Sequence, residues 1–226
     1  MIHPSARVHA TADIEDDVEV GPRTSVWHRA QLRAGARVGA DCIIGRDAFI
    51  DVGVLIGDRV KIQNAALVYH GTTVEDGVFI GPNAILTNDR YPRSVTSTGD
   101  LAGPGDWEVG QIALREGCSI GAGAIVVAGS DVGRYAMVGA GAVVTRTVTD
   151  HALVAGNPAR RLGWLCACGS RLTEAASDEV APPDPHPGAE LMCAACDRRW
   201  VYVADAESIE EVTQPADRTT RQGTPA

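Results

Sequence analysis

A histidine and an asparagine that lie eighteen residues apart are the first candidates for chemistry in this chain. An imidazole has a pKa of about 6.5, so His70 can take up a proton near neutral pH. The carboxamide of Asn88 can orient a polar group through hydrogen bonds. Read singly, His70 could be a surface histidine and Asn88 a turn cap. The pair acts together only if the fold places residues eighteen apart on one surface.

Four of the six cysteines have the spacing of metal ligands. They form a C-A-C-G and a C-A-A-C segment and are Cys166, Cys168, Cys193 and Cys196. Thiolates at this spacing can meet at one tetrahedral ion, so the segments predict a structural zinc site with no open coordination position. His186 could replace one ligand, but its D-P-H-P-G surroundings are typical of a loop.

The elements that must position these residues follow from a repeat, because an aliphatic residue stands at every sixth position. The pattern covers fifteen positions from Ile2 to Leu86 and resumes for six more from Leu114 to Val144. A helix needs apolar spacing near 3.6 and a flat strand a spacing of two, so neither fits. A triangular β-coil of eighteen residues fits, with each side pointing its aliphatic residue into a prism. His70 and Asn88 then stack on neighbouring coils, about 5 Å apart.

Small residues and glycines recur with the same period of six. Small residues usually precede the aliphatic position by two, which predicts Cys42 and Cys118 as buried structural thiols. Glycine often follows the aliphatic residue directly, as at Gly21 and Gly39, and we interpret it as the place where the backbone turns sharply. Aromatic residues make up only 4% of the chain, as expected for a core of stacked Ile, Val and Leu.

One insertion, residues 87–113, interrupts the repeat. Leu114 follows Leu86 by 28 residues, so an ordinary step of six leaves 22 residues looped out of the prism. Loops of this length are usually functional or disordered. The repeat predicts about seven coils and a prism about 33 Å long. After Val144 the segment that contains Asn157-Pro158 is expected to leave the prism.

The repeat resembles that of the hexapeptide-repeat acyltransferases. The resemblance implies an all-β, left-handed parallel β-helix, a homotrimer with active sites in the clefts between subunits, and acetyl-CoA as co-substrate. Such coils often end with a segment like G-N-P-A-R, here residues 156–160, and a basic residue nearby often lies close to the coenzyme A phosphates. Arg160 and Arg161 are therefore candidate cofactor-binding residues; the alternative is a solvated pair that caps the last coil.

The insertion opens with T-N-D-R-Y-P-R at residues 87–93. This segment is similar to the one that opens the active-site loop of N-acetyltransferases acting on 3-amino sugars carried by UDP or dTDP. The resemblance covers roughly residues 1–163 and implies an acetyl-CoA-dependent N-acetyltransferase of cell-surface polysaccharide or glycoside biosynthesis. Related enzymes differ at the position of His70 and within N-D-R-Y, so the resemblance does not identify which amino sugar is the substrate.

In that reaction an amine attacks a thioester, and an oxyanion forms before the thiolate leaves. His70 would act as general base, unless the amine arrives neutral and loses its proton to solvent, and Asn88 and Asp89 would orient the amine. A backbone N–H of the glycine-rich coils would stabilise the oxyanion. The candidate substrate-binding residues are Asn64, Arg90, Tyr91 and Arg93. The candidate cofactor-binding residues are Gly121, Ala122, Gly139, Ala140, Arg160 and Arg161. The glycines and alanines of this set could instead serve only the tight turns.

The composition divides the chain into three parts. Residues 1–163 form the predicted acyltransferase domain, residues 164–204 a zinc-ribbon-like module, and residues 205–226 a polar tail predicted to be disordered. The module holds little apolar material, and a module this small usually needs a metal or disulfides to stay folded.

Charge and hydropathy exclude several partners. The net charge of −9 argues against a general affinity for nucleic acid or anionic membranes. The N-terminus has no secretion signal and no stretch of eighteen apolar residues occurs, so we expect a cytoplasmic protein without a membrane partner.

Two other functions remain as alternatives. One is a non-enzymatic trimeric scaffold whose zinc ribbon binds a partner. The other is a γ-type carbonic anhydrase, which the six histidines disfavour because no pair has the spacing that its metal site needs.

Overall fold

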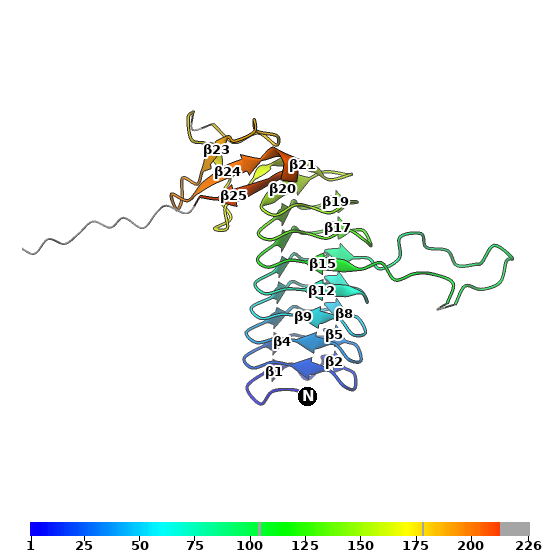
Figure 1. Ribbon diagram of the computed structural model, residues 1–226. Coiled ribbons are helices and arrows are strands. Elements are labelled where there is room, and N and C mark those ends of the chain that lie inside the picture. The colour runs from blue at the N-terminus through cyan, green and yellow to red at the C-terminus, as the bar shows by residue number, and fades with distance from the viewer. Residues whose placement is uncertain (104, 178, 213–226) are drawn as a thin grey trace, which may run out of the picture.

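The structure is a computed structural model that describes residues 1–103, 105–177 and 179–212. The chain forms a triangular β-helical prism, with a small antiparallel module at its C-terminal end and a long loop that projects from its side (Figure 1). In the described ranges, no helix has the length and apolar character needed to cross a bilayer. The predicted all-β parallel helix is confirmed.

The first face of the prism has eight parallel strands and a ninth, antiparallel one that closes its C-terminal end. The parallel strands are β1 (Arg7–Val8), β4 (Ser25–Val26), β7 (Ile43–Ile44), β10 (Lys61–Ile62), β13 (Phe79–Ile80), β16 (Ser119–Ile120), β18 (Met137–Val138) and β20 (Ala152–Ala155). The closing strand is β21 (Arg160–Trp164).

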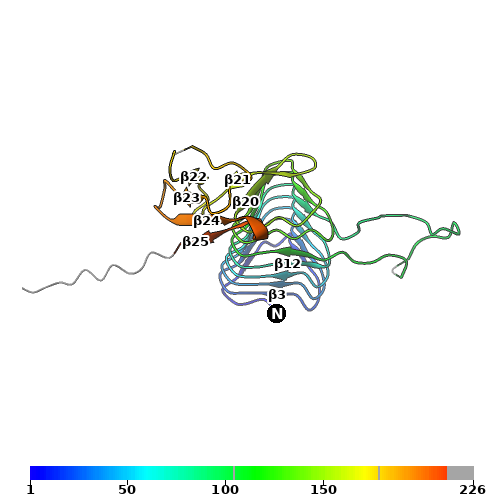
Figure 2. The same ribbon diagram turned by 45° about the horizontal axis from the view of Figure 1, so that its top comes forward.

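The second and third faces follow in each coil, so that the chain winds from the first face to the second and then to the third (Figure 2). The second face consists of β2 (Asp13–Ile14), β5 (Gln31–Leu32), β8 (Phe49–Ile50), β11 (Leu67–Val68), β14 (Ile85–Leu86), β17 (Ile125–Val126) and β19 (Val143–Val144). The third face consists of β3 (Glu19–Val20), β6 (Arg37–Val38), β9 (Leu55–Ile56), β12 (Thr72–Val74) and β15 (Ile112–Leu114). We name the two edges that flank the second face the first–second edge and the second–third edge.

The core of the prism consists of the aliphatic ladder that the period predicts. Ile44, Ile62 and Ile80 pair in register at an offset of eighteen, and each is fully buried. Only the first coil departs, because nothing stacks beneath it, and Ile2 is 45% exposed. Across the insertion Val74 pairs with Leu114. The loop therefore leaves the prism and returns without shifting the ladder, as the 22 extra residues predict.

The prism extends further than the sequence predicts. Val148 bridges to Val132, and Val154 pairs with Val138 in β18, at offsets of sixteen rather than eighteen. The expectation that the chain leaves the prism after Val144 is therefore wrong. A search for steps of six misses this last coil because it is two residues short, and the first face thus has one layer more than the seven predicted.

Glycines and left-handed turns occupy different positions of the repeat, which corrects the turn interpretation. A Cβ on Gly21 would lie 2.6 Å from the backbone of Gly39, so this glycine lets neighbouring coils approach closely. The left-handed residue stands three positions after the aliphatic one, as at Asp47 (φ 59°) and Gly53 (φ 66°). Close stacking, and not turning, explains the glycine that directly follows the aliphatic residue.

The C-terminal module is a four-stranded antiparallel sheet packed on the end of the prism. Its strands are β22 (Thr173–Glu174), β23 (Glu190–Met192), β24 (Arg199–Val203) and β25 (Ser208–Glu211), with a short 3-10 turn η1 (Ala204–Ala206) before the last. Strand β25 lies in the segment predicted to be disordered. This segment is ordered up to Glu211, since Ile209 is buried and pairs with Tyr202. The boundary predicted at residue 204 is thus one strand too early. Residues 213–226 of the predicted tail lie outside the described residues.

Candidate active site

His70 lies in the turn between β11 and β12, on the second–third edge. Its Nδ1 is 2.7 Å from the carbonyl oxygen of Val52 in the preceding coil. A carbonyl oxygen can only accept a hydrogen bond, so Nδ1 carries a proton, and in the neutral ring the lone pair then lies on Nε2. The backbone N–H of His70 donates to Asp51 Oδ2 at 3.1 Å. The exposed ring is therefore held in a tautomer that leaves Nε2 able to accept a proton.

Asn88 occupies the equivalent position in the next coil, because Val68 and Leu86 are paired. Its carbonyl oxygen accepts the N–H of Gly110 at 2.8 Å, which closes the base of the loop. Its side chain is half-buried. The coil thus places His70 and Asn88 at stacked positions beside the root of the loop.

A cavity of about 440 Å³ opens at the root of the loop. Its lining residues are Asp89, Arg90, Tyr91, Asp106, Trp107, Glu108, Val109, Gly110, Ala128 and Gly129. Asp89 Oδ1 accepts the N–H of Tyr91 at 2.8 Å, so this carboxylate also shapes the loop. Arg93 donates to the carbonyl oxygen of Pro92 at 2.8 Å and lies outside the lining. Two of the predicted substrate-binding residues, Arg90 and Tyr91, therefore share a cavity with Asp89.

Asn64 lies on the other edge, in the turn between β10 and β11. Its Oδ1 accepts the backbone N–H of Arg46 at 2.9 Å, so the carboxamide caps the preceding coil. Within one chain, Asn64 therefore does not join His70, which lies across the second face.

The predicted glycine and alanine positions continue along the first–second edge. The N–H groups of Gly121 and Gly139 are used in coil stacking, donating to the carbonyl oxygens of Val138 at 2.8 Å and Val154 at 2.7 Å. At other corners a side chain of the next coil caps the exposed turn N–H, as Asp58 does for Ala40 at 2.7 Å.

Ala122 and Ala140 lack this kind of cap. The residue that stacks on Ala122 in the next coil is Ala140, whose side chain has no acceptor. Both alanines are exposed. Neither alanine N–H donates to an acceptor among the described residues, whereas the N–H groups of Gly121 and Gly139 do.

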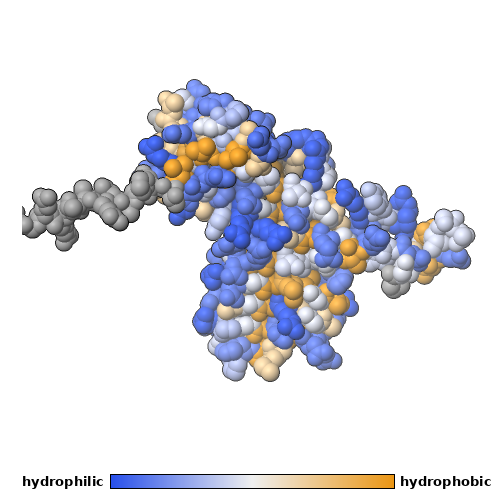
Figure 3. Space-filling view, viewed as in Figure 1, coloured by the Kyte–Doolittle hydropathy of each residue, from blue (hydrophilic) through white to orange (hydrophobic). Residues whose placement is uncertain are grey.

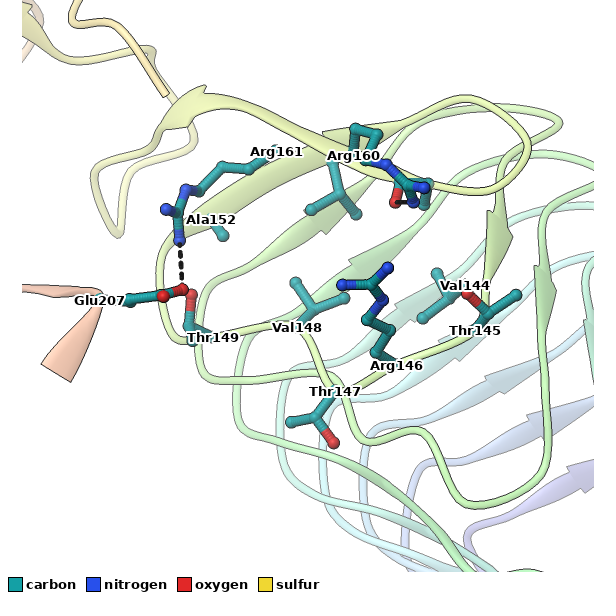
Figure 4. Close-up of a pocket in the computed structure, with 12 residues that line it drawn as sticks. Val144, Thr145, Arg146, Thr147, Val148, Thr149, Ala152, Arg160, Arg161 and Glu207 are labelled. Atoms are coloured by element: carbon teal, nitrogen blue, oxygen red, sulfur yellow. Dashed lines mark hydrogen bonds and ion pairs between the residues drawn. The ribbon is translucent and has the colours of Figure 1, made fainter. Parts of the chain in front are cut away.

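A second cavity, of about 240 Å³, lies at the C-terminal end of the second–third edge. Figure 4 shows Arg146 and Arg160 on opposite sides of it. Arg146 stands two residues after Val144, which is the position of His70 three coils further on. The strand spacing places these two positions about 14 Å apart. His70 and a cationic cavity thus share one edge of the prism.

Arg161 also lines this cavity, but its guanidinium group contacts the module. Its Nε donates to the carbonyl oxygen of Pro183 at 2.9 Å, and it forms an ion pair with Asp184. It stacks over the ring of Trp164 at 4.7 Å and lies 3.7 Å from Glu207. Arg160 has no carboxylate partner among the described residues, so the cofactor interpretation applies to Arg160 more directly than to Arg161.

The four cysteine sulfurs of the module lie within 4.8 Å of one another. The closest pairs are Cys166–Cys196 and Cys168–Cys193 at 3.5 Å and Cys168–Cys196 at 3.8 Å. A zinc ion with Zn–S bonds of about 2.3 Å needs sulfurs about 3.8 Å apart, whereas a disulfide needs about 2.05 Å. Hydrogen bonds from Ser170 lower the pKa of Cys168 to about 6, and burial raises that of Cys166 to about 12. The cluster therefore fits a tetrahedral metal and not a pair of disulfides.

The sequence analysis did not identify three features of this region. They are Arg146, the Val52 carbonyl oxygen that binds His70 Nδ1, and the backbone N–H of Ala122 that no side chain caps. The signal for Arg146 was present, because it occupies the same position of the repeat as His70. The other two depend on what the neighbouring coil does, which only the stacked structure displays.

Comparison with protein families agrees with this geometry. The family described as "Bacterial transferase hexapeptide (six repeats)" matches residues 53–88, and the "Hexapeptide repeat of succinyl-transferase" matches residues 35–70 and 115–146. Residues 35–88 and 115–146 of the prism therefore match transferase hexapeptide repeats. The second family resumes after the insertion, so the hexapeptide prism continues on both sides of the loop.

Two kinds of curated protein are similar to parts of the hexapeptide prism. A dTDP-3-amino-3,6-dideoxy-alpha-D-galactopyranose 3-N-acetyltransferase from Aneurinibacillus thermoaerophilus is 54% identical over 63 residues, 28% of this chain and 33% of that protein. The serine acetyltransferase of Escherichia coli K12 is 36% identical over 118 residues, 51% of this chain and 42% of that protein. The chain thus spans less than half of either relative.

Among solved structures, an N-acyltransferase from Bacillus cereus in complex with dTDP and coenzyme A superposes with a TM-score of 0.56. The match is 19% identical and covers 65% of this chain and 82% of that one. At this identity the likeness shows a shared fold.

Proposed function

We propose that the protein is an acetyl-CoA-dependent N-acetyltransferase that acts on the amino group of a nucleotide-linked amino sugar. The observation that carries the proposal is one edge of the prism. It holds His70, whose Nδ1 is hydrogen-bonded to the Val52 carbonyl oxygen, then the cavity at the root of the loop, then the cavity between Arg146 and Arg160. A thioester bound along this edge would have its carbonyl group near a base and its phosphates near cations.

The proposed reaction joins the amine nitrogen to the acetyl carbon and breaks the thioester C–S bond. His70 Nε2 takes the proton that the amine loses, and that proton can pass on to the departing thiolate. The carboxamide of Asn88 orients the amine from the next coil. An uncapped N–H, of Ala122 or Ala140, donates to the oxyanion or to an amide of the pantetheine arm.

The acceptor is proposed from the loop. Arg90 supplies a cation for a diphosphate, and Tyr91 supplies an aromatic ring from the same cavity wall. The similarity to the dTDP-amino-sugar N-acetyltransferase favours a nucleotide-linked amine. The serine acetyltransferases share acetyl transfer with that relative but differ in acceptor, so both support the donor half of the proposal.

We also propose that three copies of the chain associate through the second face. From β8 to β19 its outward side chains are apolar and half-buried: Phe49, Leu67, Ile85, Ile125 and Val143. Figure 3 shows that, on the side of the prism turned to the viewer, apolar side chains lie between hydrophilic ones. Within one chain this face separates His70 from Ala122. A neighbouring copy can bring the two edges together, which makes an active site shared between subunits.

For the module we propose one structural zinc ion bound by Cys166, Cys168, Cys193 and Cys196, because the sulfur distances match a tetrahedral site. With four sulfur ligands, no coordination position is open to a substrate. The prism, residues 1–163, would then carry the chemistry, and the module would begin at residue 164.

The test is to incubate the purified protein with acetyl-CoA and a panel of UDP- and dTDP-linked amino sugars and to follow the release of free thiol. We expect thiol release with at least one amino sugar and none with the matching hydroxy sugar. Failure of every sugar, together with no thermal shift on adding acetyl-CoA, would favour the scaffold alternative. For the carbonic anhydrase alternative, the described residues of a single chain hold only the cysteine group as a cluster of three or more metal-binding side chains.

A further inference from the structure

The cysteine module contributes directly to the wall of the cavity between Arg146 and Arg160. Glu207, which follows η1 of the module, is one of the residues that line this cavity. Figure 4 shows its carboxylate beside Arg161 at the rim. Every other lining residue comes from the last coils of the prism or from β21. The module therefore places one negative charge at a site whose other charged residues are three arginines.

The position of Glu207 is set by the docking of the module. Asp184 and Pro183 hold the guanidinium group of Arg161, and Trp164 Nε1 donates to the same Pro183 carbonyl oxygen at 3.1 Å. The side chain of Arg161 is only 17% exposed, whereas that of Glu207 is 70% exposed. Arg161 is thus fixed by Asp184, and most of the Glu207 carboxylate remains open to the cavity and to solvent.

We propose that Glu207 is an affinity-determining residue through which the module weakens the binding of a polyphosphate anion between Arg146 and Arg160. This inference rests on the proposed function only in naming coenzyme A as the physiological anion. A carboxylate on the rim repels an incoming phosphate and offsets one of the cations that attract it. Because the module must be folded and docked to present Glu207, the metal-binding state of the module is coupled to anion affinity.

The test compares Glu207→Gln with the wild-type protein by isothermal titration calorimetry. The probes are coenzyme A and adenosine 3′,5′-bisphosphate, each at low and at high salt. We expect Glu207→Gln to bind both probes roughly three- to tenfold more tightly at low salt, with the difference shrinking at high salt as the charge is screened. Glu210→Gln is the matched control, because it removes the same charge three residues further along the module and lines a different cavity.

The outcomes separate this inference from the proposed function. Equal tightening by Glu207→Gln and Glu210→Gln would reduce the effect to net charge and overturn the inference, as would no change in Glu207→Gln. Binding of the bisphosphate that responds to Glu207→Gln, without any binding of coenzyme A, would support the inference and refute the acetyltransferase proposal. Absence of binding by both probes would overturn both.

Discussion

The prism and the cysteine module are stabilised by different means. The prism buries one aliphatic side chain per side, coil upon coil, so that each layer such as Ile62 covers the next, Ile80. The module buries a smaller apolar set, which includes Leu172, Leu191 and Trp200, beside a cluster of four cysteines of which two are exposed. Repetition distributes the stability of the prism over many equivalent contacts, whereas the module depends on one cluster.

The largest expected effect is the loss of the module when its metal site is removed. Structural zinc in small domains supplies about 10 to 16 kcal/mol of apparent binding free energy, more than this small core can replace. Cys193→Ser or chelation should therefore expose residues 175–187 to protease, while the prism keeps its main melting transition. Limited proteolysis and calorimetry, with elemental analysis under reducing conditions, would measure this. Absence of bound metal in the wild-type protein would remove the zinc proposal.

Next in size is the effect of His70→Ala on acetyl transfer. Loss of a general base typically costs about 10² to 10⁴ in rate, and His70 is exposed, so folding should be unaffected. Steady-state kinetics would show the loss in kcat for a base and in KM for a residue that only positions the sugar. His28→Ala, an exposed histidine in an N-terminal coil, is the matched control. An unchanged kcat/KM in His70→Ala would refute both roles.

A pair of core substitutions compares the two regions directly. Ile80 is fully buried in the ladder and Ile209 is buried in the module. Ile80→Ala should lower the free energy of unfolding of the prism by about 2 to 5 kcal/mol. Ile209→Ala should leave the prism transition in place and raise only the protease sensitivity of the module. If both changes shifted a single common transition equally, the two regions would unfold as one unit.

Asn88→Ala should lower the rate of acetyl transfer by about tenfold or more, since it removes one orienting hydrogen bond. The side chain lies outside the ladder, so light scattering should find the same oligomer as in the wild type. Wild-type turnover in the folded variant would exclude Asn88 from the active site.

The smallest expected effect is a pH dependence at the seam between the two regions. His151 packs between Tyr135 and Trp200, and burial lowers its pKa below the ordinary value. A depressed folded-state pKa favours the docked module while the imidazole is neutral, so docking should weaken as the pH falls below about 6.5. Hydrogen exchange of the module between pH 7.5 and 5.5 would detect this, and His151→Gln should abolish the dependence.

The sequence predicted the prism better than its ends or its module. The period located the inward aliphatic residues from Ile2 to Val144 and the extent of the loop, because one rule applies to all of these coils. It missed Val148 and Val154, where the last coil shortens by two residues. It also missed β25, whose only buried residue is Ile209 in an otherwise polar segment.

The candidate site was predictable only in part, for a physical reason. Stacking of His70 on Asn88 follows from an offset of eighteen. The tautomer of His70 follows from the Val52 carbonyl, a backbone atom that no residue type specifies. Likewise, the ion pair between Arg161 and Asp184 joins two residues whose separation in the sequence is unrelated to the six-residue repeat. Contacts that repeat along the coils can be read from the sequence, and contacts between the prism and the module cannot.

Strand β21 has a consequence for the solubility of the prism. A stack of parallel strands ends in a row of unpaired backbone groups that could template the strand of another molecule. By reversing direction and pairing with β20, β21 takes up those groups on the first face, and it places the exposed Arg160 at the end of the stack. The antiparallel strand β21 therefore ends the stack of parallel strands, so that a second prism cannot continue the first face in the same parallel register.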